Sequence, residues 1–158
     1  MDKCSIASIR KELKNLEREE LVLVCLRLAR YKKDNKELVS FLVFQRNEEE
    51  FILEVKTEIH FEFTGLKLLS AFQQKKILQK SIRKINKYSK FCLSKTFDLV
   101  MFMFICQSLR DSGISLYSHT FAGTIYKKIL LKASKIHSTL HEEIQGDFNE
   151  DLLHLAIN

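Results

Sequence analysis

Apolar residues recur every three or four positions along almost the whole chain, and this spacing predicts seven or eight helices. Two segments, about 18–31 and 96–110, are apolar nearly all round, which is typical of helices enclosed by other helices. We therefore expect an all-α protein. Its architecture should be an irregular antiparallel multi-helix bundle of seven to eight helices, with those two segments as largely buried central helices.

Polar residues predict where several helices begin and end. Two pairs have the form of a capping box, in which one side chain accepts from a backbone amide and an acid three positions later reaches back: Asp34 with Glu37, and Asn47 with Glu50. They predict helices over 34–44 and 47–63, and Gly65 closes the second. The run 60–66 has some alternation, so a short strand is an alternative there.

The second half of the chain has longer periodic runs. An amphipathic helix is expected over about 68–92, then the apolar helix capped by Ser94 or Thr96, and then a loop over 112–118. From residue 121 to residue 144 the apolar positions form an unbroken ladder. This predicts one long helix that Gly146 ends, followed by a short terminal helix.

Length and composition agree with a folded helical protein. The 158 residues match the length of one domain, and 46% apolar with 29% charged residues is ordinary for globular chains. There is no proline and there are only four glycines, so helix breakers are scarce. We expect a single helical domain over 1–158.

Cysteine usage and the N-terminal sequence indicate a cytoplasmic protein. Cys4, Cys25, Cys92 and Cys106 form no C-x-x-C pair and sit among apolar residues, which favours buried free thiols in a reducing compartment over a disulfide framework or a zinc ribbon. Charges come too early and too often for a signal peptide. The longest uninterrupted apolar run within 93–109 has eight residues, so no membrane span is expected.

Charge is segregated along the chain. Residues 48–62 carry a net −5, whereas residues 63–97 carry +9 with no acidic residue. Six cations fall on one face of the predicted 68–92 helix: Lys76, Lys80, Arg83, Lys84, Lys87 and Lys90. Four acids repeat at every fourth position in the preceding helix: Glu50, Glu54, Glu58 and Glu62.

Three interpretations of these two stripes stay open. Both faces can be solvated, or the acidic stripe can pair with the basic one within the chain or between subunits. Alternatively, the basic face at about 75–91 binds a nucleic acid or another polyanion, gaining affinity from counterion release. Tyr88 and Phe91 flank that face and either pack or stack on bases.

Two histidines are the only weak candidates for a metal site. His137 and His141 are expected one turn apart on the ladder helix, where they can share a metal ion if His119, Asp147 or His154 supplies a third ligand. Their order is not H-E-x-x-H, so no metalloprotease base is placed. Solvated surface histidines are the alternative, and we expect no cofactor.

Two segments resemble a family of small uncharacterised bacterial helical proteins, a domain of unknown function. The segment from Ile9 to Phe44, IRKELKNLEREELVLVCLRLARYKKDNKELVSFLVF, is similar to the opening of that family, and SIRKINKYSKF, from Ser81 to Phe91, is similar to its basic middle helix. The resemblance implies a bacterial cytosolic helical domain. It implies no activity and no named site.

No catalytic motif is present: there is no Gly-rich phosphate loop, no G-x-S-x-G elbow and no nucleophile signature. The leading hypothesis is a non-enzymatic cytosolic interaction or scaffold module that binds a protein partner or itself. A nucleic-acid or other polyanion binder using the basic face is the alternative. A metal-dependent protein using His137 and His141 is the third.

Overall fold

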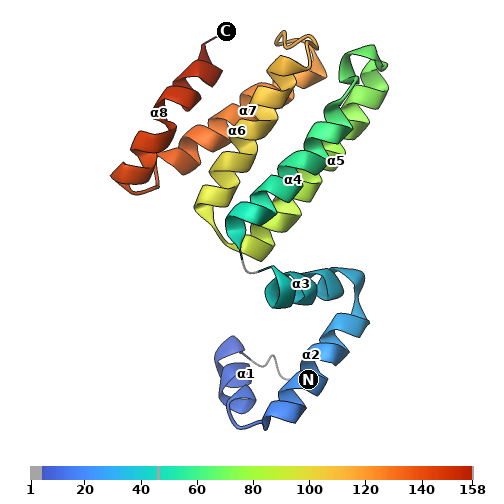
Figure 1. Cartoon of the computed structure of the whole chain (residues 1–158), viewed down its shortest axis with the longest axis vertical. Helices are drawn as coiled ribbons and strands as arrows, with labels where there is room; N and C mark the ends of the chain where they lie inside the picture. Colours follow the sequence, from blue (N-terminus) through green and yellow to red (C-terminus); the bar gives the residue numbers. More distant parts are fainter. Residues whose placement is uncertain (1–4, 46, 158) are drawn as a thin grey trace. The chain divides into compact units, whose positions relative to one another are not determined.

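The computed structural model describes residues 5–45 and 47–157, and within them every regular element is helical. The prediction of an all-α multi-helix bundle is therefore confirmed. The chain divides into two compact units, Met1–Arg46 and Asn47–Asn158 (Figure 1). That the whole chain is one domain stays a prediction. No helix in the described residues is long and apolar enough to cross a membrane.

The N-terminal unit contains α1 (Ile6–Leu13), α2 (Arg18–Tyr31) and α3 (Lys33–Phe44). The side chain of Ser5 accepts from the backbone amide of Ser8 and so caps α1. The helices α2 and α3 contact each other and are separated only by Lys32, whose extended backbone ends one helix and starts the next. The expected cap at Asp34 is wrong, because α3 has already begun at Lys33 and Asp34 lies in its first turn.

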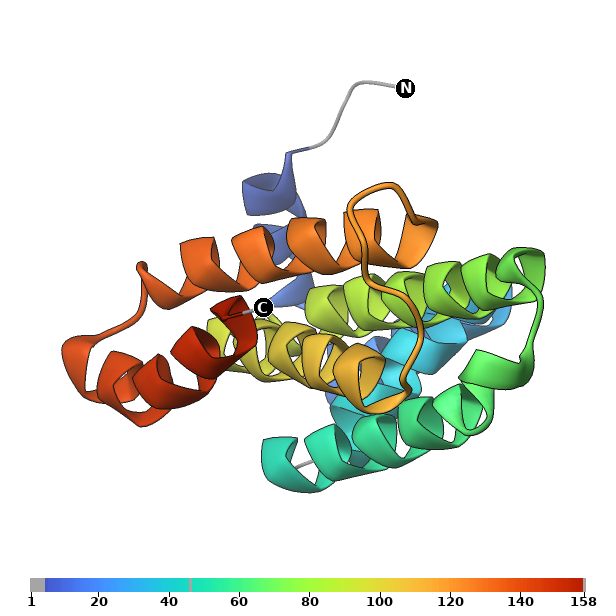
Figure 2. The ribbon, with the colours of Figure 1, turned by 90° about the horizontal axis from the view of Figure 1, so that it is seen from above.

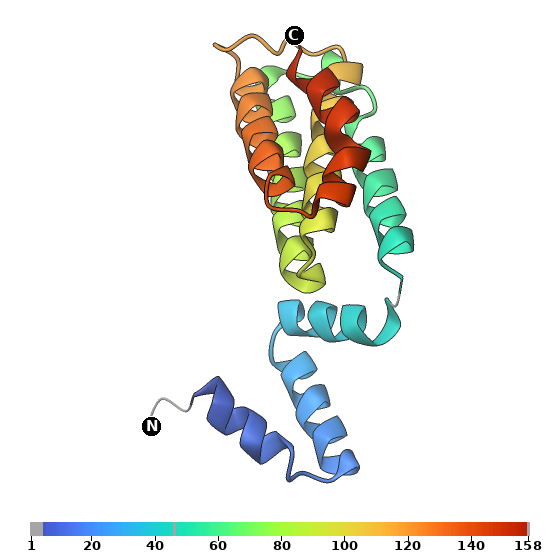
Figure 3. The ribbon, with the colours of Figure 1, turned by 90° about the vertical axis from the view of Figure 1, so that its left-hand side faces the viewer.

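The second helix of this unit is not buried, which corrects the prediction for residues 18–31. No side chain of α1, α2 or α3 is buried, and Leu23 of α2 is 66% exposed. The apolar residues of α2 cover more than half of its circumference, but only α3 contacts it extensively within the unit. Figure 3 shows α1 and α2 diverging from the turn that joins them, so α1 covers little of α2.

The C-terminal unit is a five-helix bundle built around α6 (Lys95–Asp111). Its other elements are α4 (Glu48–Phe63), the 3-10 turn η1 (Leu66–Leu68), α5 (Ala71–Cys92), α7 (Phe121–His137) and α8 (Glu142–Ala156). The central helix α6 contacts α4, α5, α7 and α8 (Figures 1 and 2). Eight of its side chains are buried, so the prediction that residues 96–110 form a largely buried central helix is confirmed.

Helix ends in this unit follow local chemistry. Asn47 accepts from the amides of Glu49 and Glu50 to cap α4, as predicted. Gly65, the second residue after α4, adopts a left-handed φ of 73°. Residues 60–63 are therefore helical, and the strand alternative for 60–66 is wrong. Ser70, which was not predicted as a cap, forms a capping box with Gln73 at the start of α5.

The predicted long helix over 121–144 is instead two helices, α7 and α8. The hydroxyls of Ser138 and Thr139 donate to the carbonyl oxygens of Lys135 and Ile136, which satisfies the last turn of α7 locally. The helix α8 then begins after His141, and Gly146 lies inside it rather than at a helix end.

Candidate partner-binding surfaces

The packing of α4 against α5 brings the acidic and basic stripes together at one end. The Nζ atom of Lys80 lies 2.8 Å from Oε1 of Glu62. The Nζ atom of Lys84 bridges the two helices, 2.9 Å from Oε2 of Glu58 and 3.1 Å from Oε1 of Glu62. The buried hydroxyl of Ser81 donates to the other oxygen of Glu62 at 2.9 Å. These side chains form an internal clamp between the two helices, which we call the α4–α5 clamp.

Burial and pairing act in opposite directions on the ionised groups of the α4–α5 clamp. Burial by itself raises the pKa of the Glu62 carboxyl, but hydrogen bonds from Lys80, Lys84 and Ser81 outweigh it and hold that pKa below its ordinary value. Burial lowers the pKa of Lys84, yet hydrogen bonds to Glu58 and Glu62 leave it raised. Both groups are therefore charged over the whole neutral range.

The remaining members of the two stripes have different surroundings. Glu50 and Glu54 are exposed on α4, as are Arg83 and Lys90 on α5. The ammonium groups of Lys76 and Lys87 lie 5.3 and 5.8 Å from the ring centroids of Phe72 and Phe91, respectively. The two cations of the α4–α5 clamp already have carboxylate partners, so a polyanion would have to compete for them.

The aromatic residues beside the basic face pack against protein. The Tyr88 ring makes an edge contact with Phe51, with centroids 5.0 Å apart, and a tilted contact with Phe91 at 6.0 Å. Phe51 is buried and stacks in turn on Phe97 at 5.9 Å. Burial raises the pKa of the Tyr88 hydroxyl, and the charge of Glu58 adds to this effect. Tyr88 thus links α5 to the core.

The two candidate metal ligands do not share a helix. His137 is the last residue of α7, and its Nε2 atom lies 3.0 Å from the carbonyl oxygen of Gln145. His141 precedes α8, with its Nδ1 atom 4.0 Å from a carboxylate oxygen of Glu143. The expected one-turn spacing is wrong because α7 ends at His137 and α8 begins only after His141. Across residues 5–45 and 47–157, no three His, Cys, Asp or Glu side chains come together in a metal-binding arrangement.

Two of the three described cysteines are less buried than predicted. Cys106 is buried, Cys92 is half-buried and Cys25 is exposed, and all three are free thiols. Burial raises the pKa of both Cys92 and Cys106 to about 12. Cys25 is exposed because it lies on α2, which has no buried side chain. Cys4 lies outside the described residues.

An apolar groove in the N-terminal unit was not predicted. A groove of about 520 Å³ lies between α1 and the start of α2, with an apolar wall formed by Ile6, Ile9, Leu13, Leu16 and Leu21. Arg10 and Lys14 also line it. Periodicity identifies these apolar residues but not their exposure, because a helix face that faces a partner has the same spacing as one that faces its own core.

Comparison with known proteins gives no information on these surfaces. No family model, curated protein or solved structure matches the chain. The resemblance of Ile9–Phe44 and Ser81–Phe91 to a bacterial helical family therefore stays an expectation.

Proposed function

We propose that the protein is a non-enzymatic helical interaction module whose N-terminal unit binds a protein partner. The observation that carries this proposal is that residues 5–45 fold into three helices without a single buried side chain. Ile6 and Phe44 are 76% and 80% exposed. Helices bury an apolar stripe against another element to be stable, and exposed apolar patches on this scale are typical of interaction surfaces. A partner that covers the unit would supply the missing core.

The partner that fits the groove best is an acidic amphipathic helix. The apolar wall would receive side chains spaced at i, i+3, i+4 and i+7, which is the general mode of helix-in-groove recognition. Arg10 and Lys14 would face carboxylates along the edge of that helix. Neither cation has an ion pair within the part of the chain that the structure describes. Charge complementarity therefore selects an acidic partner over a basic one.

The expected affinity is modest. Burying the exposed parts of Ile6, Ile9 and Leu13 contributes about 4 kcal/mol in total, because Ile6 is 76% exposed but Ile9 and Leu13 only 42% and 36%. The four apolar anchors of the partner helix contribute about 2 kcal/mol each. The loss of translational and rotational freedom and the ordering of side chains offset much of that gain. About 5 to 8 kcal/mol remains, which corresponds to a dissociation constant between about 1 and 100 µM. Binding at that level is suited to a reversible module in the cytoplasm, the location that the scattered free thiols favour.

Fluorescence anisotropy with a designed peptide tests the proposal. The probe is a labelled 18-residue helical peptide with a Leu/Ile face flanked by Glu, and its partner control carries Lys in place of every Glu. The wild-type protein should bind the acidic peptide with a micromolar Kd and the basic peptide at least tenfold more weakly. The double variant Ile9→Gln, Leu13→Gln should lose at least tenfold in affinity.

A matched variant and a mass measurement complete the test. Leu53→Gln changes an exposed leucine of α4, outside the groove, and should leave peptide binding unchanged. Equal binding of the acidic and basic peptides, or no binding below about 100 µM, would refute the acidic-helix partner. Light scattering tests whether a second copy of the chain covers the groove instead. If the wild-type protein is a dimer and the Ile9, Leu13 variant is a monomer, the groove is covered by a second copy instead.

A further inference from the structure

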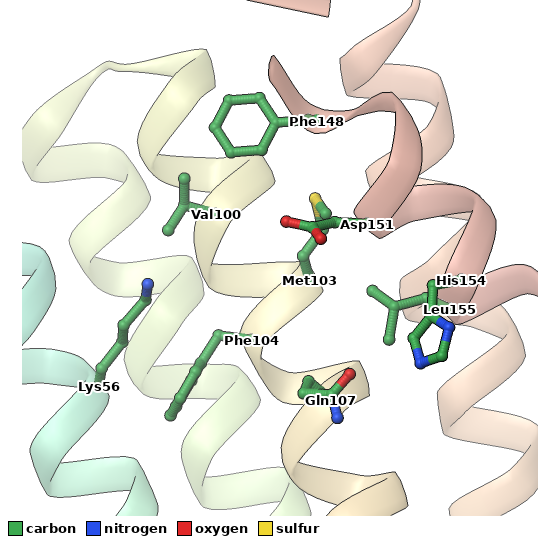
Figure 4. Close-up of a pocket in the computed structure, with 9 residues that line it drawn as sticks. All are labelled: Lys56, Val100, Met103, Phe104, Gln107, Phe148, Asp151, His154 and Leu155. Carbon is green, nitrogen blue, oxygen red and sulfur yellow. The ribbon is translucent and has the colours of Figure 1, made fainter. Parts of the chain in front are cut away.

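A second cavity, in the C-terminal unit, is unrelated to the groove of α1. It has a volume of about 350 Å³ and lies between α4, α6 and α8 (Figure 4). Its floor is formed by side chains of the central helix, among them Val100, Met103 and Phe104, and Leu155 of α8 closes it from the other side. Met103 and Leu155 belong to the buried core, so this floor is rigidly held.

One cation enters this cavity from α4. Lys56 is half-buried, and its ammonium group lies 5.6 Å from the centroid of the Phe104 ring. Figure 4 shows its side chain extended along the Phe104 ring with the nitrogen beside the cavity. It makes no ion pair with any of the described residues. Burial without a carboxylate partner lowers the pKa of Lys56.

The opposite wall carries polar side chains, including a carboxylate. Asp151 and His154 project from α8 and lie across the cavity from Lys56 (Figure 4). The amide of Gln107 already donates to Asp111 at 2.8 Å, and Arg110 donates to the carbonyl oxygen of His154. The two ends of the cavity therefore carry opposite charges: a cation lies at one wall, a carboxylate lies at the other, and the floor between them is apolar.

We propose that this cavity binds a small amphipathic monocarboxylate, with its carboxylate on Lys56 and its apolar body on Val100, Met103 and Phe104. A carboxylate would supply the charge partner that Lys56 lacks. The far end of such a ligand is uncharged or a hydrogen-bond donor, because a second anion would face Asp151. This site is independent of the proposed partner groove.

The same residues disfavour other ligand classes. Phosphate groups are typically held by several donors, such as a helix N-terminus or an Arg fork, and here Lys56 is the single Lys or Arg among the described residues that line the cavity. An organic cation would be repelled by the half-buried Lys56, and Asp151 on the opposite wall is exposed, so its attraction is screened by solvent. Small-ligand sites commonly have volumes from about 300 Å³ upward and are mostly apolar with a few convergent polar groups, which is the composition found here.

Titration followed by NMR tests the site with octanoate as the probe. Octanoate should bind the wild-type protein with a Kd of about 0.1–1 mM and shift the methyl signals of Val100, Met103 and Leu155. Lys56→Met keeps the apolar stem but removes the charge, so octanoate affinity should fall at least fivefold. Lys128→Met removes an exposed cation of α7 and should leave the affinity unchanged.

Two further probes separate the role of the charge from a loss of folding. The neutral analogue 1-octanol should bind wild type and Lys56→Met equally, which shows that the cavity of the variant is intact. Octylammonium should bind wild type at least fivefold more weakly than octanoate. The proposal is overturned if octanoate binds Lys56→Met as well as it binds wild type, if 1-octanol matches octanoate on wild type, or if no methyl signal at the cavity shifts up to 5 mM octanoate.

The groove of the N-terminal unit has its own control. The variant Ile9→Gln, Leu13→Gln should retain full octanoate affinity, because the two sites share no residue. Loss of octanoate binding in that variant would place the ligand in the groove and refute the cavity. Failure of the peptide experiment, by contrast, has no bearing on this site.

Discussion

The energetic coupling between Glu62 and Lys84 is the most direct measure of the α4–α5 clamp. Both side chains are mostly buried, with 17% and 20% of their surface exposed, and their charged atoms lie 3.1 Å apart. The perturbation is a double-mutant cycle of Glu62→Gln and Lys84→Met. Each substitution removes a charge but keeps most of the side-chain volume, so cavity effects are small.

The magnitude follows from what each group retains. Glu62→Gln loses a charged hydrogen bond to Lys84 and a pair with Lys80, which is 68% exposed and therefore contributes little. A neutral bond to Ser81 can persist, and Lys84 keeps Glu58 at 2.9 Å. We expect each single variant to lower the free energy of unfolding by about 1–2 kcal/mol. The coupling energy should be about 1 kcal/mol.

Urea unfolding followed by circular dichroism measures the four free energies at pH 7. Glu50→Gln is the matched control, because Glu50 is exposed on the same helix, and it should change stability by less than about 0.5 kcal/mol. Because the pair is largely desolvated, the coupling should persist in 0.5 M NaCl. A coupling energy below about 0.3 kcal/mol would refute the reasoning, because the stripes would then be solvated surfaces despite their contact.

Three other predictions concern pH, glycine and thiols. Because the pKa of Glu62 is lower in the folded than in the unfolded protein, its ionisation stabilises the fold at pH values above the unfolded pKa of about 4.5, and this contribution is lost as pH falls through the folded pKa. The difference in unfolding free energy between wild type and Glu62→Gln should therefore vanish in urea titrations at strongly acidic pH. Gly123→Ala should destabilise by about 3 kcal/mol in the same assay, because a Cβ there would lie 2.1 Å from a backbone oxygen. Gly146→Ala, with open space inside α8, should stabilise by about 0.8 kcal/mol, and the opposite order would contradict both assignments. Mass spectrometry after brief iodoacetamide treatment at pH 8 should find Cys25 alkylated and Cys106 intact, since burial raises the pKa of Cys106 to about 12; equal labelling would contradict its burial.

Periodicity predicted the helices well but not their surroundings. The apolar segments at 18–31 and 96–110 look alike in sequence, yet only the second is enclosed. The helix α6 has four neighbours within its unit, whereas α2 has α3 alone as an extensive contact. Local spacing carries no information about how many elements converge on a segment, and this number decides burial.

Helix boundaries were predictable where a side chain makes a specific hydrogen bond. Asn47 caps α4 as predicted, and Ser94, one of the two residues expected as alternatives, caps α6. The break after His137 was not predicted, because the apolar ladder keeps its period across it. Hydroxyl groups of Ser138 and Thr139 end α7 through bonds to carbonyls three residues earlier, a competition that a count of apolar positions does not register.

The candidate sites were predictable to different degrees. The spacing of the acidic and basic stripes indicated complementary faces, and the structure pairs two acids with two cations while leaving Glu50, Glu54, Arg83 and Lys90 exposed. The role proposed for Lys56 was missed. A signal was present, because Lys56 is the single Lys or Arg among six glutamates in 48–62.

The glutamates and Lys56 lie on different edges of α4, and this separates the α4–α5 clamp from the proposed carboxylate site. At 100° per residue, the buried side chains Phe51, Val55, Ile59 and Phe63 span about 120° of the helix. Glu58 and Glu62 lie at one edge of this arc, where they meet α5, and Lys56 lies just beyond the other edge, where it meets the cavity beside α6. Both edges are anchored by the same buried face, so loss of the α4–α5 clamp should not displace Lys56. Stability and carboxylate binding are then independent functions of one helix, and substitutions at either edge can be interpreted separately.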